Sequence, residues 1–375
     1  MNRNKILLLV PSINFARFRK RAIALYNLNQ EVTVLAFERD QYTSLDYPMG
    51  YTSLGKLKNN KYIVRVFIYL LSIYKIFNYF KSQDVVYAFG FDVAMMAWVT
   101  RLFHYNKPKL VYEVADIRGI FLGESVFNKL MRSYERFLLS RISLLVVTSP
   151  TFIEGYYRNY LHYKGSIKYH VLENKLDKNQ LPYYKGNPIN LKKDTLVIGY
   201  FGVFRCRVAI ETLRFLVEES KGYIKVYLRG TILEELRETF ASISAIEGIQ
   251  YDGSYVYPKD LPQVYNQVDI VLAQHLWGDE NLLWARSNRF YESCCFQRPM
   301  IAQKDTEIAN LIKELNIGFS VDLSRPEETM EEILTIDHHR KHEWLKNLEN
   351  LPTSLYFYED DHELLIKKLD VNDTL

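Results

Sequence analysis

The feature that most constrains the fold is a repeated alternation of short apolar segments with longer segments of helical pattern. Each short segment is rich in β-branched or aromatic residues and nearly all apolar, which is typical of parallel strands buried on both faces. In the first half of the chain they lie at residues 5–10, 32–37, 85–88, 110–114, 144–148 and 169–172, and in the second half at 196–201, 224–228, 249–251, 270–273, 300–302 and 318–321. The alternation predicts two α/β units, each a doubly wound parallel sheet with helices on both faces.

A polar segment separates the two series of strands. Residues 178–194 are rich in Lys, Asn, Pro and Gly and carry no apolar period, so they are predicted to form a linker. A length of 375 residues also exceeds what one hydrophobic core usually organises. We therefore predict a first Rossmann-like domain at residues 1–180 and a second at residues 190–352.

Composition narrows the class of protein. Apolar residues make up 48% and charged residues 25%, the balance of an ordinary globular protein, and a net charge of +4 gives no support for nucleic-acid binding. The cysteines, Cys206, Cys294 and Cys295, are odd in number and two are adjacent, so no disulfide framework is expected. The apolar run at residues 6–11 is too short for a secretory signal. We expect a reducing, cytoplasmic environment.

A basic and apolar stretch in the first half leaves two interpretations open. Residues 62–80 are apolar but contain Arg65 and Lys75, so they are a poor membrane span. Further lysines flank the stretch at positions 56, 58, 61 and 81. One interpretation is a helix that lies on an anionic membrane surface, which would make the protein peripheral to the membrane. The other is an amphipathic helix packed on a sheet.

Ligands of doubly wound sheets bind outside the carboxyl ends of the strands, so residues directly after strands are the first candidates for a site. In the second half, Gly202 follows an apolar strand and would let the backbone approach a ligand closely. Arg205 and Arg207 come next, and their guanidinium groups suit the oxygens of a diphosphate. A second and third glycine at dinucleotide spacing are missing, which argues against a nicotinamide site.

A second constellation combines a loop, a helix and a strand over residues 285–302. Ser287 or Asn288 is a good N-cap for a helix whose N–H groups would bind phosphate, with Arg286 or Arg289 adding charge. Glu292, one turn into that helix, can accept both vicinal hydroxyls of a ribose. A solvated glutamate or a partner for Arg289 is the alternative for Glu292.

No metal or cofactor is predicted. His338, His339 and His342 have a spacing that could mimic a ligand cluster, but their helix is highly charged and a solvated face explains them better.

The second constellation resembles the donor-site segment of GT-B glycosyltransferases, in particular the large bacterial family 4 (group 1) type. Its matching residues are 288–292 followed by 298–302, where those enzymes have a glutamate-bearing helix and a conserved strand entry. Further segments are similar to the same family in the same order, at residues 171–177, 198–202, 251–255 and 268–270. The resemblance covers the chain from about Lys5 to Ala302.

The resemblance implies a GT-B fold, in which two Rossmann-like domains face each other across a cleft and the tail, residues 353–375, packs back on the first domain. It implies a nucleotide-sugar donor held by the second domain and a saccharide or polyprenyl-linked acceptor. The enzyme would build cell-surface polysaccharide such as capsule or lipopolysaccharide, in the cytoplasm at the inner face of the plasma membrane. The donor-site residues that it implies are Gly202, Arg205, Arg207 and Arg289 at the diphosphate, Glu292 at the ribose, Ser287 and Asn288 at the helix start, and Tyr255 near the base.

One departure from the family concerns the stereochemistry of transfer. Trp284 stands where many retaining members have a further glutamate, so retention and inversion both stay open. An inverting transfer needs a general base at a strand end in the first domain. We predict Asp116 in that role, with Glu113 in reserve and Arg118 as the group that lowers the pKa of Asp116 or binds an acceptor phosphate. A capping or ion-paired Asp116 is the structural alternative.

Two other functions fit the same pattern. A nucleotide-sugar epimerase would share the fold and the donor site but would need no acceptor. A non-catalytic sugar-binding scaffold would explain the missing glutamate at Trp284.

Overall fold

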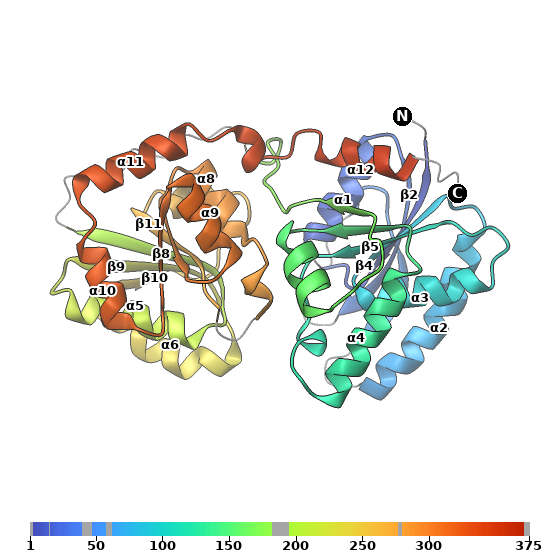
Figure 1. The fold of residues 1–375 in the computed structure, drawn as a ribbon, viewed down its shortest axis with the longest axis horizontal. Coiled ribbons are helices and arrows are strands. Elements are labelled where there is room, and N and C mark those ends of the chain that lie inside the picture. The colour runs from blue at the N-terminus through green and yellow to red at the C-terminus, as the bar shows by residue number, and fades with distance from the viewer. Residues whose placement is uncertain are drawn as a thin grey trace. The chain divides into compact units, whose positions relative to one another are not determined.

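The computed structural model describes residues 3–14, 16–39, 47–57, 62–181, 195–276 and 280–370, and the chain divides into two compact units. The first unit is made of the chain up to Asn174 together with the chain from Glu359 onward. The second unit is Lys175–Tyr358. Figure 1 shows a sheet with helices on both faces in each unit.

The first unit is built on a parallel sheet with the strand order β3-β2-β1-β4-β5-β6-β7. Its strands are β1 (Lys5–Val10), β2 (Glu31–Arg39), β3 (Thr52–Leu57), β4 (Val85–Phe89), β5 (Lys109–Val114), β6 (Leu144–Val147) and β7 (Tyr169–Val171). The sequence predicted each of these except β3. That edge strand, TSLGKL, is half polar and carries a glycine, so it lacks the apolar run that marks the buried strands.

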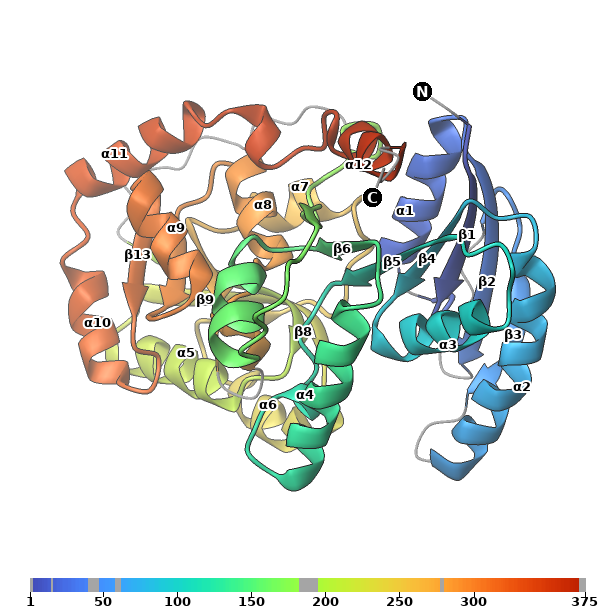
Figure 2. The ribbon, with the colours of Figure 1, turned by 45° about the vertical axis from the view of Figure 1, so that its right-hand side comes forward.

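The helices of the first unit lie on both faces of this sheet. They are α1 (Ala16–Asn27), α2 (Tyr62–Phe80), α3 (Phe91–Leu102), α4 (Val126–Leu139), a π-helix (Phe152–Tyr160) and α12 (Asp361–Asp370). In Figure 1, α1 and α12 lie on one face and α2, α3 and α4 on the other. Figure 2 shows α1 and α2 on opposite sides of β1 and β2.

The second unit repeats the design with the strand order β10-β9-β8-β11-β12-β13. Its strands are β8 (Leu196–Phe204), β9 (Ile224–Ile232), β10 (Ile249–Tyr251), β11 (Ile270–Gln274), β12 (Met300–Gln303) and β13 (Gly318–Val321). The helices are α5 (Arg207–Glu219), α6 (Arg237–Ile243), α7 (Leu261–Tyr265), α8 (Asn288–Cys295), α9 (Glu307–Leu315), α10 (Pro326–Leu334) and α11 (His338–Glu349). The prediction of two doubly wound parallel sheets is confirmed.

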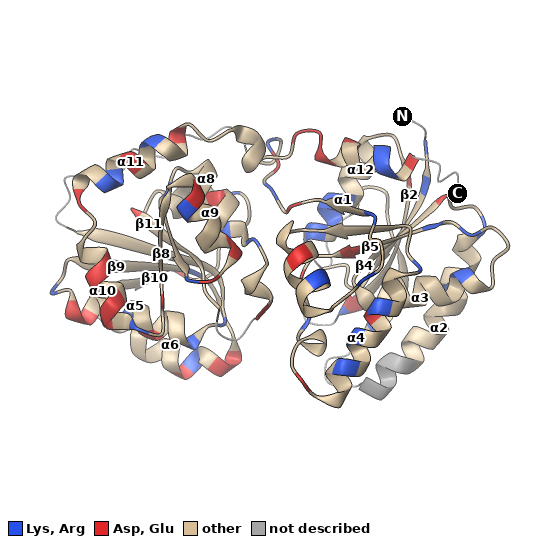
Figure 3. Ribbon diagram, in the orientation of Figure 1, with Lys and Arg blue, Asp and Glu red and all other residues tan. Residues whose placement is uncertain are grey.

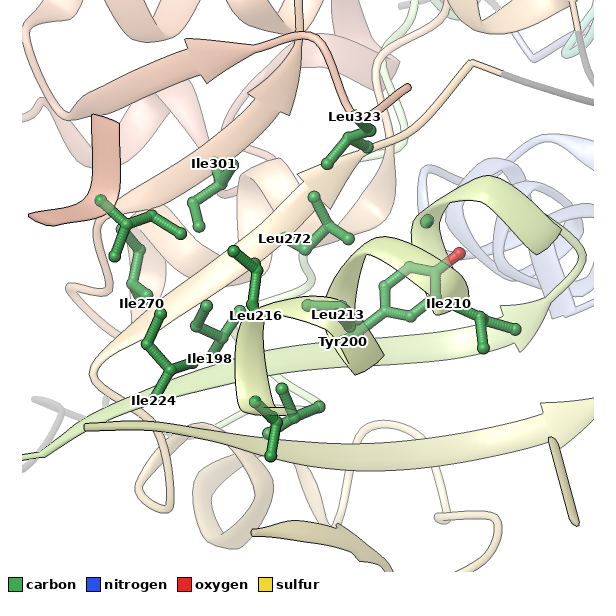
Figure 4. Packing of buried hydrophobic residues seen from close by; sticks show 14 of the residues in the cluster. Ile198, Tyr200, Ile210, Leu213, Leu216, Ile224, Ile270, Leu272, Ile301 and Leu323 are labelled. Atoms are coloured by element: carbon green, nitrogen blue, oxygen red, sulfur yellow. The ribbon is translucent and has the colours of Figure 1, made fainter. Parts of the chain in front are cut away.

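The core of the second unit fixes the strands that carry the candidate site. Leu213 and Leu216 of α5 pack over Ile198, Tyr200 and Leu272 on one face of the sheet (Figure 4). A separate buried cluster, which includes residues of α8 and of β11, covers the other face. The strand order reverses between β8 and β11, because the chain adds β9 and β10 on one side of β8 before it returns for β11. That switch point is where an open α/β sheet binds its ligand.

Two glycines lie opposite each other where β8 pairs with β9 at this end of the sheet. Gly202 and Gly230 are register partners and both have positive φ, +102° and +150°. A Cβ on Gly230 would lie 1.7 Å from the carbonyl oxygen of Gly202, so only glycine fits there. The strand β8 runs from Leu196 to Phe204, so it is three residues longer than the strand predicted at 196–201.

Residues 62–80 were interpreted either as a helix on a membrane surface or as an amphipathic helix packed on a sheet. The helix α2 packs on the first unit through one face and exposes large side chains on the other. Ser72, Ile76 and Phe80 are fully buried against the unit, whereas other large side chains of α2 face outward. Among the described residues no helix has the length and apolar character needed to cross a membrane. Lys58 and Lys61, part of the basic cluster in the sequence, lie outside the described residues.

The C-terminal helix α12 is joined to the first unit by buried polar groups. Glu113 on β5 is 1% exposed, pairs with Arg21 of α1 and accepts a hydrogen bond from the hydroxyl of Tyr87 at 2.5 Å. Arg21 in turn lies 2.6 Å from Nε2 of His362 on α12. Lys109 Nζ also donates to the carbonyl of Leu369 at 2.6 Å. The helix α12 is thus joined to α1 near its first residues and to β5 near its last.

We predict that acid destabilises the first unit through two neutral histidines. Burial and nearby cations lower the pKa of His170 to about 4, and burial and Arg21 lower that of His362 to about 3. In the unfolded chain both imidazoles have a pKa of about 6.5, so at a pH between that value and the lowered pKa values the unfolded state binds more protons. The stabilisation from neutral histidine is therefore complete above about pH 6.5 and is lost as the pH falls below it.

The measurement is urea denaturation between pH 8 and pH 5. His362→Gln keeps an acceptor for Arg21 without a titrating group, so it should show a smaller loss of stability on acidification than the wild type. His339→Gln changes an exposed histidine and is the control. Equal acid dependence in the wild type and in His362→Gln would contradict the assignment.

Candidate functional site

Arg289 on α8 ties together the carboxyl ends of the two strands that flank the switch point. Its Nη1 donates to the carbonyl of Phe201 on β8 at 2.6 Å, and its Nε donates to the carbonyl of Ala273 on β11 at 3.0 Å. The guanidinium also lies over the ring of Tyr200, 4.9 Å from its centroid. One side chain therefore satisfies two strand-end carbonyls and places a positive charge between them.

The neighbourhood of Arg289 includes a neutral histidine that the sequence analysis did not single out. His275 follows β11 directly, is 3% exposed, and has Nδ1 3.1 Å from the hydroxyl of Tyr200 and 3.5 Å from Nη2 of Arg289. Because guanidinium can only donate, Nδ1 is an acceptor and Nε2 carries the proton. Burial, Arg289 and Arg205 lower the pKa of His275 to about 3, so the ring is neutral at physiological pH.

Nε2 of His275 is buried and has no hydrogen-bond partner within the part of the chain that the structure describes. A buried donor without an acceptor costs about 1–3 kcal/mol, and such groups gather where function requires them. A histidine directly after an apolar strand at the switch point is the sequence signal that would have pointed to His275.

The structure brings several of the predicted donor-site residues to this place. Gly202 lies beside Arg289, because a Cβ on it would be 3.9 Å from Nη1. Arg205 is exposed and close enough to act on two buried groups. Burial raises the pKa of Tyr200 and the charge of Arg205 partly offsets that rise, whereas burial, Arg289 and Arg205 together lower the pKa of His275. Arg207 is exposed as the first residue of α5, and the contacts that join Arg289, Tyr200 and His275 do not include it.

The first backbone N–H groups of α8 receive no capping hydrogen bond from the N-cap side chain. Ser287 is the N-cap residue, but its hydroxyl donates to the carbonyl of Ala273 at 2.7 Å and makes no capping bond to its own helix. Asn288 begins the helix and is exposed. Arg286, the alternative to Arg289 in the sequence analysis, is engaged by Glu307 on α9 at 2.7 Å. Arg289 is therefore the arginine that adds charge at this helix N-terminus.

Glu292 lies one turn further along α8 in a pocket of tyrosines. Its side chain is buried, and its Oε2 accepts a hydrogen bond from the hydroxyl of Tyr265 at 2.7 Å. Burial raises the pKa values of Tyr255 and Tyr257, and the negative charge of nearby Glu292 raises both further. Tyr255 of the predicted base-binding segment thus lies near Glu292 of the predicted ribose site.

In the first unit, Asp116 lies just beyond the carboxyl end of β5. Its carboxylate is 62% exposed and pairs with Nη1 of Arg17 on α1 at 3.4 Å. Arg118, which we expected to act on Asp116, pairs with Asp92 at the start of α3 at 2.9 Å. Glu113, the reserve base, is sealed between Arg21 and Tyr87 and serves the buried network described above. Of the two carboxylates, Asp116 is the one exposed to solvent.

Known proteins resemble this chain in sequence or in fold. No family model matches the chain. The succinoglycan biosynthesis protein ExoL of Rhizobium meliloti is 26% identical over 339 residues, 85% of this chain and 81% of that protein. Sucrose-phosphate synthase from Thermosynechococcus elongatus has a TM-score of 0.72 at 13% identity, covering 97% of this chain and 98% of that one. Anabaena HepE, solved in complex with UDP and glucose, has a TM-score of 0.67 at 16% identity, covering 98% and 100%.

The chain has the GT-B fold. The predicted fold class and the resemblance to GT-B glycosyltransferases are thereby confirmed. A UDP-N-acetylglucosamine 2-epimerase also shares the fold, with a lower TM-score of 0.57. The solved structures that share this fold thus include glycosyltransferases as well as an epimerase, and the curated relative is named for succinoglycan biosynthesis.

We predict that Arg289→Met destabilises the protein by about 2–3 kcal/mol, because it leaves the carbonyls of Phe201 and Ala273 without their charged donor. Arg207→Met is the matched control, since it removes an exposed arginine from the same unit and should change stability by less than about 0.5 kcal/mol. Chemical denaturation measures both free energies of unfolding. Equal effects of the two substitutions would show that Arg289 does not hold the strand ends together.

Proposed function

We propose that this protein transfers a sugar from a nucleotide diphosphate sugar to a hydroxyl group of a saccharide during synthesis of a bacterial surface polysaccharide. The observation that carries the proposal is the cluster of Arg289, Arg205 and Gly202 at the carboxyl ends of β8 and β11, in a unit with GT-B topology. Two guanidinium groups and a glycine at a sheet switch point provide charge and close backbone access for a diphosphate.

The roles of the donor-site residues follow from their positions. Arg289 and Arg205 neutralise the diphosphate, and the backbone of Gly202 approaches it. Ser287, Asn288 and Arg207 lie at helix starts, where N–H groups and charge favour phosphate oxygens. Glu292 accepts hydrogen bonds from the ribose hydroxyls, and Tyr255 contacts the base. A uracil nucleotide is the first probe, because HepE was solved with UDP.

The chemistry of transfer requires stabilisation of the leaving nucleotide diphosphate and activation of the acceptor. The cationic donor site supplies the first, since negative charge develops on the diphosphate as the glycosidic bond breaks. Asp116 supplies the second in an inverting reaction, by taking the proton of the acceptor hydroxyl as the new bond forms. Its exposure leaves the carboxylate available, and Arg17 holds it in place.

The acceptor that we propose is a saccharide carried on a polyprenyl lipid, so the enzyme works in the cytoplasm at the inner face of the membrane. ExoL is named for the synthesis of succinoglycan, a polysaccharide. A polysaccharide grows by addition of sugars to a saccharide, which supports a saccharide as the acceptor. A lipid carrier requires the protein to meet the membrane.

We predict that UDP raises the melting temperature of the wild type and that Glu292→Ala abolishes this shift. Binding to the native state stabilises it by mass action, and Glu292→Ala removes the acceptor for the ribose hydroxyls. Glu238→Ala, an exposed glutamate of α6, is the control and should keep the full shift. Because Glu292 is buried, Tyr265→Phe tests the pocket without removing the carboxylate and should keep most of the shift. An equal response of the wild type and Glu292→Ala to UDP would refute the site.

We predict that Asp116→Asn binds UDP as the wild type does but loses turnover by at least about 100-fold, the lower end of general-base contributions. Glu154→Gln, an exposed acid in the π-helix, is the control. The assay follows sugar transfer from a panel of UDP-sugars to lipid-linked saccharides, and the anomeric configuration of the product shows retention or inversion.

The same panel without acceptor separates the alternatives. Accumulation of an epimer of the donor in the absence of any acceptor would replace transfer by epimerisation. Absence of affinity for any nucleoside diphosphate in calorimetry would favour the scaffold.

A further inference from the structure

We propose that His275 donates a hydrogen bond from Nε2 to the terminal phosphate of the bound nucleoside diphosphate, the phosphate that carries the sugar in the donor. The inference rests on the proposed function and deepens it, because none of the donor-site residues assigned above is a histidine. This contact lets the site bind a nucleoside diphosphate more tightly than a nucleoside monophosphate.

The hydrogen bonds of Tyr200 and Arg289 fix the tautomer of His275. Its Nδ1 lies 3.1 Å from the hydroxyl of Tyr200 and 3.5 Å from Nη2 of Arg289. The guanidinium can only donate, so Nδ1 accepts and the one proton of the neutral ring is on Nε2. The two ring nitrogens direct their hydrogen bonds to different sides of an imidazole. The Nε2–H group therefore points away from Tyr200 and Arg289.

The Nε2–H group is a donor that the protein leaves unsatisfied. The side chain of His275 is buried, and its Nε2 has no hydrogen-bond partner among the residues that the structure describes. A buried N–H group without an acceptor is costly, and a ligand that supplies an acceptor removes that cost on binding. His275 directly follows β11, at the switch point where an open α/β sheet binds its ligand. An unused donor thus lies where the ligand is expected.

The charges around His275 favour an anionic acceptor. Arg289 and Arg205 are the cations whose charge, together with burial, lowers the pKa of His275 to about 3. The strands β8 and β11 contain no charged residue, and Figure 3 accordingly draws both in tan. A neutral N–H donor beside two guanidinium groups fits a phosphate oxygen, because the arginines attract the negative charge and the N–H group adds a directed bond.

The position of His275 relative to Glu292 favours the terminal phosphate. Glu292, the proposed ribose contact, raises the pKa values of Tyr255 and Tyr257 but is not among the charges that shift the pKa of His275. Arg289 precedes Glu292 on α8 and contacts His275. A diphosphate that extends from a ribose at Glu292 therefore passes Arg289 first and reaches His275 with its far end.

A buried Nε2 without a partner does not make a site by itself. His104 in the first unit also has one, but its ring lies against those of Phe77 and Phe80, with centroids 4.1 and 5.2 Å away. Aromatic packing accounts for the burial of His104, whereas His275 combines the unused donor with two nearby guanidinium groups. His104 is therefore the matched control for a substitution of His275.

The test is isothermal titration calorimetry of the full-length protein with UDP and with UMP. In His275→Asn the amide oxygen replaces Nδ1 as the acceptor for Tyr200 and Arg289, and no N–H group remains at the position of Nε2. We expect the dissociation constant of UDP to rise by about 10-fold or more, the effect of one hydrogen bond to a charged group, and that of UMP to change by less than about 2-fold. His104→Asn should bind both nucleotides as the wild type does.

A second variant and a second measurement complete the test. His275→Gln places an amide nitrogen near the position of Nε2, so it should bind UDP more tightly than His275→Asn does. Nuclear magnetic resonance of the wild type with isotope-labelled histidine needs no variant. The Nε2–H signal of a neutral histidine should shift further on addition of UDP than on addition of UMP.

The inference is overturned by any of three results. Unchanged affinity of His275→Asn for UDP would remove His275 from the diphosphate, and a raised KM for a UDP-sugar in that variant would then assign it to the sugar. An equal loss of affinity for UDP and UMP would show that His275 only maintains the shape of the site. A wild type in which bound UDP shifts no neutral-histidine signal would exclude the contact even if both variants fail to fold.

These three results leave the proposed function standing, because the wild type still binds UDP in each of them. A wild type that binds no nucleoside diphosphate at all would refute the proposed function, and the inference about His275 with it.

Discussion

The bonds of Arg289 to the carbonyls of Phe201 and Ala273 are the interaction on which the candidate site depends. Parallel strands end with carbonyl groups that the ladder leaves unpaired, and a buried carbonyl without a donor is costly. Arg289 satisfies one such carbonyl on β8 and one on β11, directly at the switch point. A structural need is thereby met by a cation, and in the function that we propose the same residue binds the diphosphate.

Arg289 lies among neutral groups on the side of Tyr200 and His275. Tyr200 stacks under the guanidinium, and His275 is held neutral by burial between Arg289 and Arg205. Glu292, the carboxylate of α8, accepts a hydrogen bond from Tyr265 and lies among tyrosines. Arg286, by contrast, is paired with Glu307, which largely neutralises its positive charge near the start of α8. A positive site next to a buried carboxylate suits a nucleotide, which presents anionic phosphate and neutral ribose hydroxyls in sequence.

The charged groups described in the first unit form two sets, one buried and one exposed. The buried set of Glu113, Arg21, Tyr87 and His362 binds α12 to the sheet, and a titrating group inside it makes that attachment sensitive to acid. The exposed set, Asp116 with Arg17 and Asp92 with Arg118, lies at the carboxyl ends of the strands where a substrate can reach it. The outward faces of α2, α3 and α4 carry exposed apolar side chains.

The sequence by itself determined the two sheets, because each buried strand is a short apolar run between helices, and β3 was missed because an edge strand needs no such run. It also pointed to Gly202, Arg289 and Glu292, since residues directly after strands and at helix starts have a defined place in this fold. Only the tertiary structure showed that Arg289 rather than Arg286 stays near the strand ends, that Glu113 is sealed, and that His275 joins the site. Those outcomes depend on which side chains from distant segments meet, and partners such as Glu307 or Arg21 lie 21 and 92 residues away from the groups they pair with.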